Sequence, residues 1–445
     1  MFLYPANDQE HERYNKLLCG YMSFGRLAGT ILEFVLIDVA ILIDHKYYCV
    51  MIYKLNKRIF DEILPVQREE LLETFSNYNA KGNAIELVYE DHNYQCMPLL
   101  ENVLSSNIHA LSFFSGCGGL DIGTQMAGVK IITSLDFDKD AIATLRSNKF
   151  FAHTEHRCDD IRNVTAKDYS SILKKNNPEK LILVGGPPCQ PFSKGAYWIT
   201  NEKRKGVEDE RNMIGEYLRI IEEIRPDGFL LENVESILHP TNKVIVEYIE
   251  SKITQMGYNF LRVLANATDY GVPQRRKRVI FLASRNKIVG EPSKLPEEDS
   301  SKVNVLNWIG RFDTSEYAEP NWESTSGKTY DQELKAVPPG QNYIALSAKR
   351  GYPNPRFIAN KRFWNFLLKL HPLLPSWTIS AQPGPWVGPF HWNNRRLRSV
   401  EVAAIQTFPV DYDIIGSRRE VQRQIGNAVP SLMAQKFVEH LVKFL

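Results

Sequence analysis

Residues 110–121, ALSFFSGCGGLD, decide the fold, because they join an apolar run to a turn that contains three glycines. The run Ala110 to Phe114 has the length and composition of a buried strand. Glycines at a strand-to-helix turn let the backbone pass close to a ligand and point its amide groups at it. The spacing is neither Gly-x-Gly-x-x-Gly nor that of a phosphate-binding P-loop. The turn therefore favours a cofactor with an adenosine and no pyrophosphate over NAD or ATP.

Two carboxylates follow the glycine turn at informative positions. Asp136 closes the next apolar run, at about the spacing where an acidic residue binds ribose hydroxyls in dinucleotide folds, and Asp160 follows the third strand. The carboxyl ends of parallel strands meet at one edge of a sheet, which is where open α/β sheets bind their ligands. We therefore expect both acids beside the glycine turn.

From about Asn107 to Ser284, short apolar runs alternate with amphipathic stretches, the pattern of an α/β protein with a doubly wound, mostly parallel sheet. Helices are expected over 140–147, 213–224 and 243–256, and Gly257 ends the last. After Ser284 the chain becomes rich in Pro, Gly, Asn, Ser and Trp without a clear period, which predicts a smaller irregular domain. The apolar runs are 110–114, 129–135, 181–184, 228–231 and 279–283.

These patterns predict four segments. Residues 1–106 form an N-terminal extension without a chemical motif, and 107–288 form a catalytic, cofactor-binding domain. Residues 289–420 form the irregular domain. Residues 421–445 contribute a C-terminal helix, beginning near Gln424, that completes the catalytic domain.

Composition excludes several classes of protein. The chain has 445 residues, of which 43% are hydrophobic and 24% charged, so a disordered or fibrous protein is excluded. Its longest apolar stretch, near 34–43, is too short to span a membrane. The six cysteines form no C-x-x-C pair, which argues against a zinc site or a disulfide framework. We expect no metal centre and a reducing cytoplasmic environment.

The small net charge of +2 hides a basic segment. Residues 335–400 contain ten Lys and Arg and no acid, interleaved with Trp, Phe and Tyr. A solvated face is one interpretation, and a surface that binds nucleic-acid phosphates and bases is the other. Side chains that could contact bases or phosphates are Arg350, Arg356, Arg362, Asn393 and Arg395.

A second turn carries a candidate nucleophile. The apolar run 181–184 leads into Gly186-Pro187-Pro188-Cys189, and the prolines around Cys189 fix its backbone at the carboxyl end of a strand. A thiol held rigidly beside a cofactor pocket can act as a nucleophile. Glu232 lies at the end of the next strand, and Arg276 and Arg278 precede the last one. An acid and an arginine beside a thiol suggest a substrate that is protonated and oriented while the thiol adds to it.

The ordered motifs resemble those of the DNA (cytosine-5) methyltransferases, over roughly Asn107 to Leu445. The resemblance rests on Phe114-x-Gly-x-Gly-Gly119, Pro187-Pro-Cys-Gln-Pro-Phe-Ser193, Glu232-Asn-Val234, Gln274-x-Arg-x-Arg278, Gln406-x-Phe-Pro409 and Gln424-Ile-Gly-Asn-Ala-Val-Pro430. It implies a methyltransferase fold, the cofactor S-adenosyl-L-methionine (product S-adenosyl-L-homocysteine), and a target-recognition role for the irregular domain. The implied cofactor-binding residues are Phe114, Gly116, Gly118, Gly119, Leu120, Asp136, Phe137, Asp160, Ile161, Pro187, Asn427, Ala428 and Val429.

The resemblance also implies a mechanism on double-stranded DNA. Cys189 adds to C6 of a cytosine flipped out of the duplex, Glu232 protonates N3, Arg278 orients the base through O2, and Arg276 supports Cys189. Residues 193–211 match the mobile loop that closes over the base. The expected protein acts as a monomer in the bacterial cytoplasm or nucleoid, in a restriction-modification system whose endonuclease is encoded separately.

Some features depart from the family, and rival interpretations remain open. Val400 stands where the family usually has Arg before the residue that matches Glu401, and the first hundred residues have no counterpart. A tRNA cytosine-5 methyltransferase would share Cys189 and Glu232, and a non-catalytic DNA-binding regulator could use the same fold. An amino-methyltransferase would carry Asp/Asn-Pro-Pro-Tyr, and an oxidoreductase has only the glycine turn in its favour.

Overall fold

The computed structural model describes residues 106–188, 213–297, 299, 303–348, 355–357 and 364–445. These residues fall into two compact units. The sheet unit contains the described residues up to 303 together with 375–383 and 399–445. The loop-rich unit contains the described residues of 304–374 together with 384–398.

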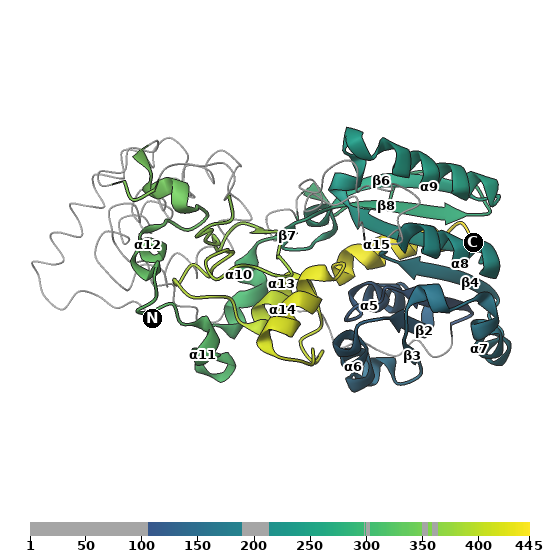
Figure 1. Ribbon diagram of the computed structural model, residues 1–445, viewed down its shortest axis with the longest axis horizontal. Coiled ribbons are helices and arrows are strands. Elements are labelled where there is room, and N and C mark those ends of the chain that lie inside the picture. The colour runs from purple at the N-terminus through teal and green to yellow at the C-terminus, as the bar shows by residue number, and fades with distance from the viewer. Residues whose placement is uncertain (1–105, 189–212, 298, 300–302, 349–354, 358–363) are drawn as a thin grey trace, which may run out of the picture. The chain divides into compact units, whose positions relative to one another are not determined.

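A seven-stranded sheet forms the centre of the sheet unit, in the order β3-β2-β1-β4-β5-β8-β6 (Figure 1). Neighbouring strands from β3 to β5 are parallel, whereas β8 is antiparallel to both β5 and β6. The predicted mostly parallel α/β fold is thus confirmed. The strands are β1 (Ile108–Phe113), β2 (Lys130–Asp136), β3 (Glu155–Cys158), β4 (Lys180–Gly185), β5 (Gly228–Val234), β6 (Asn259–Asn266) and β8 (Lys277–Ser284).

Separate apolar clusters cover the two faces of this sheet, as a doubly wound fold requires. On one face, α8 (Met213–Ile224) and α9 (Lys243–Gln255) bury Tyr217, Ile221 and Ile249 against the strands. On the other, α5 (Gly119–Met126) and α15 (Ser431–Val442) bury Leu120, Met433 and Phe437 against the strands. The predicted helices are confirmed as α6 (Lys139–Ser147), α8 and α9; α7 (Ser170–Asn176) was not predicted.

The C-terminal segment is two helices, not the single helix predicted from Gln424. Helix α14 spans Arg418–Asn427, and α15 begins at Ser431. Pro430 separates them, because proline disfavours a helical conformation at the residue before it and its own ring fits the start of a helix. Helix α13 (Ser399–Ile405) precedes them in the same unit.

Helices α5 and α15 approach so closely that Gly123 has no room for a side chain. A Cβ added there would lie 2.4 Å from the Ser431 carbonyl oxygen and 2.5 Å from Cβ of Ala434. Alanine favours a free helix by about 1 kcal/mol over glycine. Overpacking costs about 1–3 kcal/mol and outweighs that gain here.

We therefore expect Gly123→Ala to lower the free energy of unfolding, measured by urea denaturation. Gly128→Ala is the control, because Gly128 has open space around it and a φ of 80°. The control should lose only the strain of a left-handed residue, about 1 kcal/mol. A higher unfolding free energy for Gly123→Ala than for the natural chain would contradict the close packing.

The loop-rich unit has the irregular structure predicted for this domain, but its bounds differ from the predicted ones. It contains only short helices among its described residues: α10 (Val305–Ile309), α11 (Pro320–Glu323) and α12 (Asp331–Ala336). A small core forms around Leu334, Tyr343 and Phe390. The predicted domain 289–420 is divided, since 289–303, 375–383 and 399–420 pack with the sheet unit. Strand β9 (Ser376–Trp377) pairs there with β7 (Gln274–Arg275), which fixes the segment to the sheet unit.

Basic side chains of the acid-free segment 335–400 form ion pairs with acidic residues that precede this segment in the loop-rich unit. Ion pairs join Lys335 to Asp331 (2.9 Å), Arg356 to Glu333 (2.7 Å), Arg395 to Asp313 (2.8 Å) and Arg398 to Glu323 (2.5 Å). Lys369 is fully buried and donates to the Val337 carbonyl and to Oδ1 of Asn394, and burial lowers its pKa to about 7. These basic side chains therefore stabilise the loop-rich unit as well as contributing positive charge to it.

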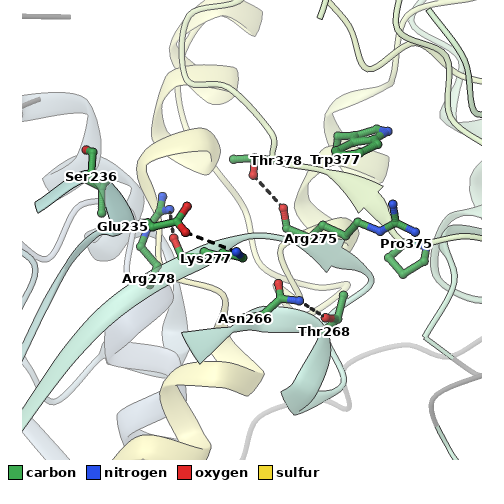
Figure 2. Close-up of a pocket in the computed structure, with 11 residues that line it drawn as sticks. Glu235, Ser236, Asn266, Thr268, Arg275, Lys277, Arg278, Pro375, Trp377 and Thr378 are labelled. Atoms are coloured by element: carbon green, nitrogen blue, oxygen red, sulfur yellow. Dashed lines mark hydrogen bonds and ion pairs between the residues drawn. The ribbon is translucent and has the colours of Figure 1, made fainter. Parts of the chain in front are cut away.

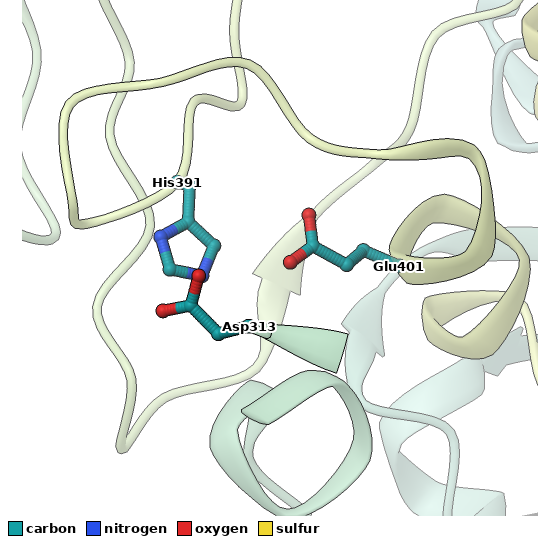
Figure 3. A group of neighbouring side chains, drawn as sticks. All are labelled: Asp313, His391 and Glu401. Carbon is teal, nitrogen blue, oxygen red and sulfur yellow. The ribbon is translucent and has the colours of Figure 1, made fainter. Parts of the chain in front are cut away.

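Two of the candidate base-contacting side chains are engaged inside this unit. Arg395 and Asn393 both donate to Asp313, which Figure 3 draws near His391 of the same unit. Arg356 keeps an exposed side chain (54%) although it pairs with Glu333. Arg350 and Arg362 lie outside the described residues. No helix in the described part of the chain is long and apolar enough to cross a membrane.

Candidate active site

The Asp136 carboxylate links the glycine turn after β1 to the turn after β2 through hydrogen bonds. One carboxylate oxygen accepts from the Gly116 amide (2.8 Å) and the other from the Asp138 amide (2.9 Å). Phe114 and Gly116 both have positive φ values, 55° and 52°. For a phenylalanine this conformation is uncommon and marks a constrained position. Burial raises the pKa of Asp136, while the two amide hydrogen bonds oppose that shift.

A cavity of about 290 Å³ opens beside these two turns. Its lining includes five of the predicted cofactor residues: Phe114, Asp136, Phe137, Asp160 and Ile161. The Phe137 side chain is 71% exposed, an unusual position for a large aromatic ring. Asp160 caps the turn that follows it and pairs with Arg162 at 2.6 Å. A flat aromatic face next to carboxylates suits the adenine ring and the hydroxyl and amino groups of an adenosyl cofactor.

The other predicted cofactor residues frame the turn from outside this lining. A Cβ on Gly119 would lie 2.3 Å from the Val429 carbonyl oxygen and 3.1 Å from Cβ of Ala428, so the C-terminal motif rests directly on the glycine turn. Gly118 begins α5 in the left-handed conformation (φ 88°). Leu120 is buried in the core, whereas Asn427 is exposed.

Asp121 is a buried carboxyl that sequence reasoning missed. It is fully buried, accepts from the Ser112 hydroxyl (2.5 Å) and the Ser134 hydroxyl (2.7 Å), and so links the ends of β1 and β2. Desolvation by burial raises its pKa to about 6, against the two serine hydrogen bonds. Because the folded pKa lies above the unfolded value, the folded state holds this proton more tightly. Stability from this group is present below about pH 4 and is lost as the pH rises towards 6.

Asp121→Asn is expected to remove this dependence on pH. The shift from 3.8 to about 6 corresponds to about 3 kcal/mol. The difference in unfolding free energy between the variant and the natural chain should therefore grow in favour of the variant between pH 4 and 6. Urea denaturation at a series of pH values measures it. A difference that stays constant over this range would show that Asp121 titrates normally.

Glu232 and Arg278 form the best-defined pair of the predicted catalytic residues. Glu232 lies near the end of β5 and Arg278 near the start of β8, and these strands are neighbours in the sheet. Nε of Arg278 lies 2.7 Å from Oε1 of Glu232, and both side chains are nearly buried (13% and 11% exposed). The other carboxylate oxygen would touch a Cβ on Gly186 at 3.0 Å, which explains a glycine there. The carboxylate is thus held between an arginine and the turn that leads to Cys189.

The same turn is anchored by the residue after Glu232. The Asn233 side-chain amide donates to the Pro187 carbonyl (3.0 Å). Pro187 is buried and Pro188 lines the cofactor cavity. Cys189 itself and the predicted mobile loop 193–211 lie outside the described residues. The described turn ends one residue before Cys189, beside both Glu232 and the cavity.

Arg276 is buried and its hydrogen-bond partners are backbone carbonyls. Its guanidinium donates to the Gly426 oxygen (3.0 Å) and the Ile379 oxygen (3.5 Å), and desolvation lowers its pKa well below the usual value. Gln274 accepts from the Ile379 amide (3.1 Å) and donates to the side chain of Gln406 (2.9 Å). These contacts give Arg276 a positioning role, because they join β7, residues 375–383 and the C-terminal motif. They also explain two glutamines whose role the motif alone did not reveal.

A second, larger cavity of about 780 Å³ adjoins the Glu232–Arg278 pair. Figure 2 shows its lining, in which Lys277 and Arg278 come from the start of β8, Glu235 follows the end of β5, and Arg275 and Trp377 come from the paired strands β7 and β9. Lys277 pairs with Glu235 at 3.3 Å. The lining thus holds three cations and one acid among mostly uncharged residues, and Arg278 is itself paired with Glu232.

Curated relatives resemble the chain over most of its length. It is 34% identical to the type II methyltransferase M.SacI of Streptomyces achromogenes over 380 residues, which cover 77% of this chain and 94% of that protein. It is 30% identical to M.NgoFVII of Neisseria gonorrhoeae, over 74% of this chain and 85% of that one.

Solved structures share the fold. A chain described as a DNA modification methyltransferase encoded within an E. coli prophage superposes with a TM-score of 0.56 at 22% identity, covering 76% of this chain and 99% of its own. The Entamoeba histolytica methyltransferase EhMeth gives a TM-score of 0.52 at 15% identity, covering 76% and 98%. The family model for the C-5 cytosine-specific DNA methylases matches residues 108–443, nearly all of the described structure. The chain belongs to the C-5 cytosine-specific DNA methylase family and is a DNA (cytosine-5) methyltransferase.

Proposed function

We propose that the enzyme methylates one short sequence of duplex DNA, as the modification enzyme of a type II restriction-modification system. The observation that carries the chemistry is the Glu232–Arg278 pair, held at 2.7 Å against the turn that leads to Cys189. The curated relatives are named type II methyltransferases, which supports the restriction-modification context. A separately encoded endonuclease of the same specificity would be the partner.

S-adenosyl-L-methionine is the proposed cofactor, and it supplies the methyl group that cytosine C5 receives. Phe137 offers an exposed ring for adenine, and Asp136 and Asp160 offer carboxylates for the hydroxyl and amino groups. The glycine turn allows the backbone to approach the ligand closely. The same cavity includes Pro188, which supports a cofactor site next to the segment that carries Cys189.

The chain's own residues would act on the cytosine as follows. The Cys189 thiolate forms a bond to C6, and the electron pair of the C5–C6 double bond moves towards C5. Glu232 gives N3 the proton that offsets the negative charge developing in the ring. Arg278 holds Glu232 through Nε and donates from Nη1 to the Lys277 carbonyl (2.8 Å), and its Nη2 would donate to the base O2. Once C5 carries the methyl group, loss of the C5 proton, departure of Cys189 as a thiolate and return of the N3 proton to Glu232 restore the aromatic ring.

The loop-rich unit is the proposed target-recognition domain. Cytosine C5 cannot be reached inside a stacked duplex, so the base must be flipped out at a cost of a few kcal/mol. Exposed basic side chains such as Arg356 would bind DNA phosphates, and aromatic side chains would contact the edges of the nucleobases. We propose that the protein acts as a monomer on DNA in the bacterial cytoplasm or nucleoid.

Bisulfite sequencing tests this proposal. Cytosine-unmethylated genomic DNA is incubated with the purified protein and S-adenosyl-L-methionine, with Cys189→Ala in parallel. Methylation confined to one short sequence, and absent with the variant, is the expected result and also identifies the site. Methylation of tRNA without methylation of DNA would overturn the proposed substrate.

A further inference from the structure

We propose that the larger cavity binds the DNA strand next to the target cytosine, with Arg275 contacting a flanking phosphate and Trp377 stacking on a flanking base. The inference rests on the proposed function and deepens it, because it names a subsite for the substrate. Arg275 stands at a variable position of the Gln274-x-Arg-x-Arg278 motif, and Trp377 lies outside every motif that relates the chain to its family. Their roles therefore follow from this structure alone.

The position of the cavity makes a strand-binding role possible. Arg278 lines the cavity and also binds Glu232, so the cavity begins where the reacting base would sit. Its volume of about 780 Å³ leaves space for more than one small group. A flipped nucleotide remains bonded to its neighbours, and the phosphates on either side must pass close to the pocket that holds the base.

The chemistry of the lining suits a nucleic-acid strand. Lys277 and Arg278 are paired with Glu235 and Glu232, so Arg275, which is exposed, is the cation of the lining best placed to meet a phosphate. The Arg275 guanidinium lies 5.1 Å from the centroid of the Trp377 ring, and Figure 2 draws these two side chains next to each other. Arginine stacked on an aromatic ring gives a flat surface with positive charge along it. Single-stranded nucleic acid is bound by this combination of stacking rings and cations.

The two side chains are held in place by a buried framework. Arg275 and Trp377 face each other in the register of the parallel pair β7–β9. Side chains alternate along this strand, so the flanking Gln274 and Arg276 are buried while Arg275 points outward. Gln274 and Arg276 together fix the amide and the carbonyl of Ile379, two residues beyond Trp377. The Thr378 hydroxyl adds a hydrogen bond to the Arg275 carbonyl (2.8 Å). A surface supported in this way is preorganised for a ligand.

The test couples changes in the protein to changes in the DNA. The duplexes contain the unmethylated recognition sequence. On the 5′ or the 3′ side of the target cytosine they carry either a methylphosphonate, which removes one phosphate charge, or an abasic nucleotide. The protein variants are Arg275→Ala, Trp377→Ala and Trp377→Phe. Lys243→Ala is the matched control, because Lys243 is an exposed cation (76%) on α9, outside the cavity.

With unmodified DNA, Arg275→Ala should lower kcat/KM about tenfold and reduce the slope of log Kd against log salt by about one. Trp377→Ala should lower kcat/KM about tenfold, and Trp377→Phe should retain most of it. One methylphosphonate should impair the natural enzyme about tenfold and Arg275→Ala hardly at all. An abasic flanking nucleotide should likewise impair the natural enzyme about tenfold and Trp377→Ala hardly at all. Lys243→Ala should match the natural enzyme throughout.

Independent changes have additive free energies, so their fold-losses in kcat/KM multiply. The inference is overturned if the loss for a protein change combined with a DNA change equals the product of the two separate losses to within about twofold, on both sides of the target. It is also overturned if Arg275→Ala leaves the salt dependence unchanged. Unaltered thermal unfolding of the variants excludes a folding defect as the cause of lost activity. If the natural enzyme methylates no DNA, the proposed function fails first, whereas normal methylation without coupling overturns this inference alone.

Discussion

Replacing Cys189 by alanine is expected to abolish methyl transfer, with a loss of kcat of about 10⁴-fold or more. The thiolate supplies the bond to C6, without which C5 is a poor nucleophile. The measurement is transfer of a tritiated methyl group to a duplex that carries the recognised sequence. DNA affinity should remain within a few fold of the natural enzyme, because the change removes one sulfur atom and no charge-bearing contact to phosphate.

A substituted base makes this prediction specific to Cys189. In a duplex with 5-fluorocytosine at the target, fluorine replaces the proton that must leave C5, so the enzyme should remain bonded to C6. We expect the natural enzyme to give an adduct that survives denaturing electrophoresis and Cys189→Ala to give none. Cys158→Ala is the control, since Cys158 is an exposed free cysteine at the end of β3. An adduct with Cys189→Ala, or its loss with Cys158→Ala, would place the nucleophile elsewhere.

Much of the sheet could be predicted because its central strands are buried on both faces and therefore form continuous apolar runs. The run 228–231 became β5 (Gly228–Val234), and 279–283 became β8 (Lys277–Ser284). Strand β6 (Asn259–Asn266) was not predicted. It lies at the edge of the sheet with only two buried residues, so it leaves no apolar run to detect.

The candidate site was predictable where a side chain acts at the end of its own strand. Phe114, Asp136 and Asp160 meet in one cavity because β1, β2 and β3 are parallel neighbours. The contact between Val429 and Gly119 could not be predicted, since a backbone carbonyl leaves no trace in the residue type. The structural role of Arg395 was also hidden, because its partner Asp313 lies outside the acid-free segment.

The second large effect is expected for Glu232→Gln, which should slow formation of the 5-fluorocytosine adduct by about 10²–10⁴-fold. This is the range that general acid catalysis contributes, and glutamine keeps the shape of the side chain without a transferable proton. The amide oxygen of the introduced glutamine can still accept from Nε of Arg278, so the orientation of both side chains should persist. Affinity for DNA and for the cofactor, measured by calorimetry, should change by no more than a few fold.

Arg278 separates this chemical role from a structural one. Because both partners are nearly buried, removing either one leaves an uncompensated charge, a loss of about 3–5 kcal/mol when a buried pair is broken. Glu232→Gln and Arg278→Gln should therefore destabilise the fold to a similar degree, while the double variant recovers part of the stability. If the loss of activity followed stability, the double variant would regain activity as well. We expect it to be at least as slow as Glu232→Gln, because it lacks both the proton that N3 requires and the guanidinium that orients the base.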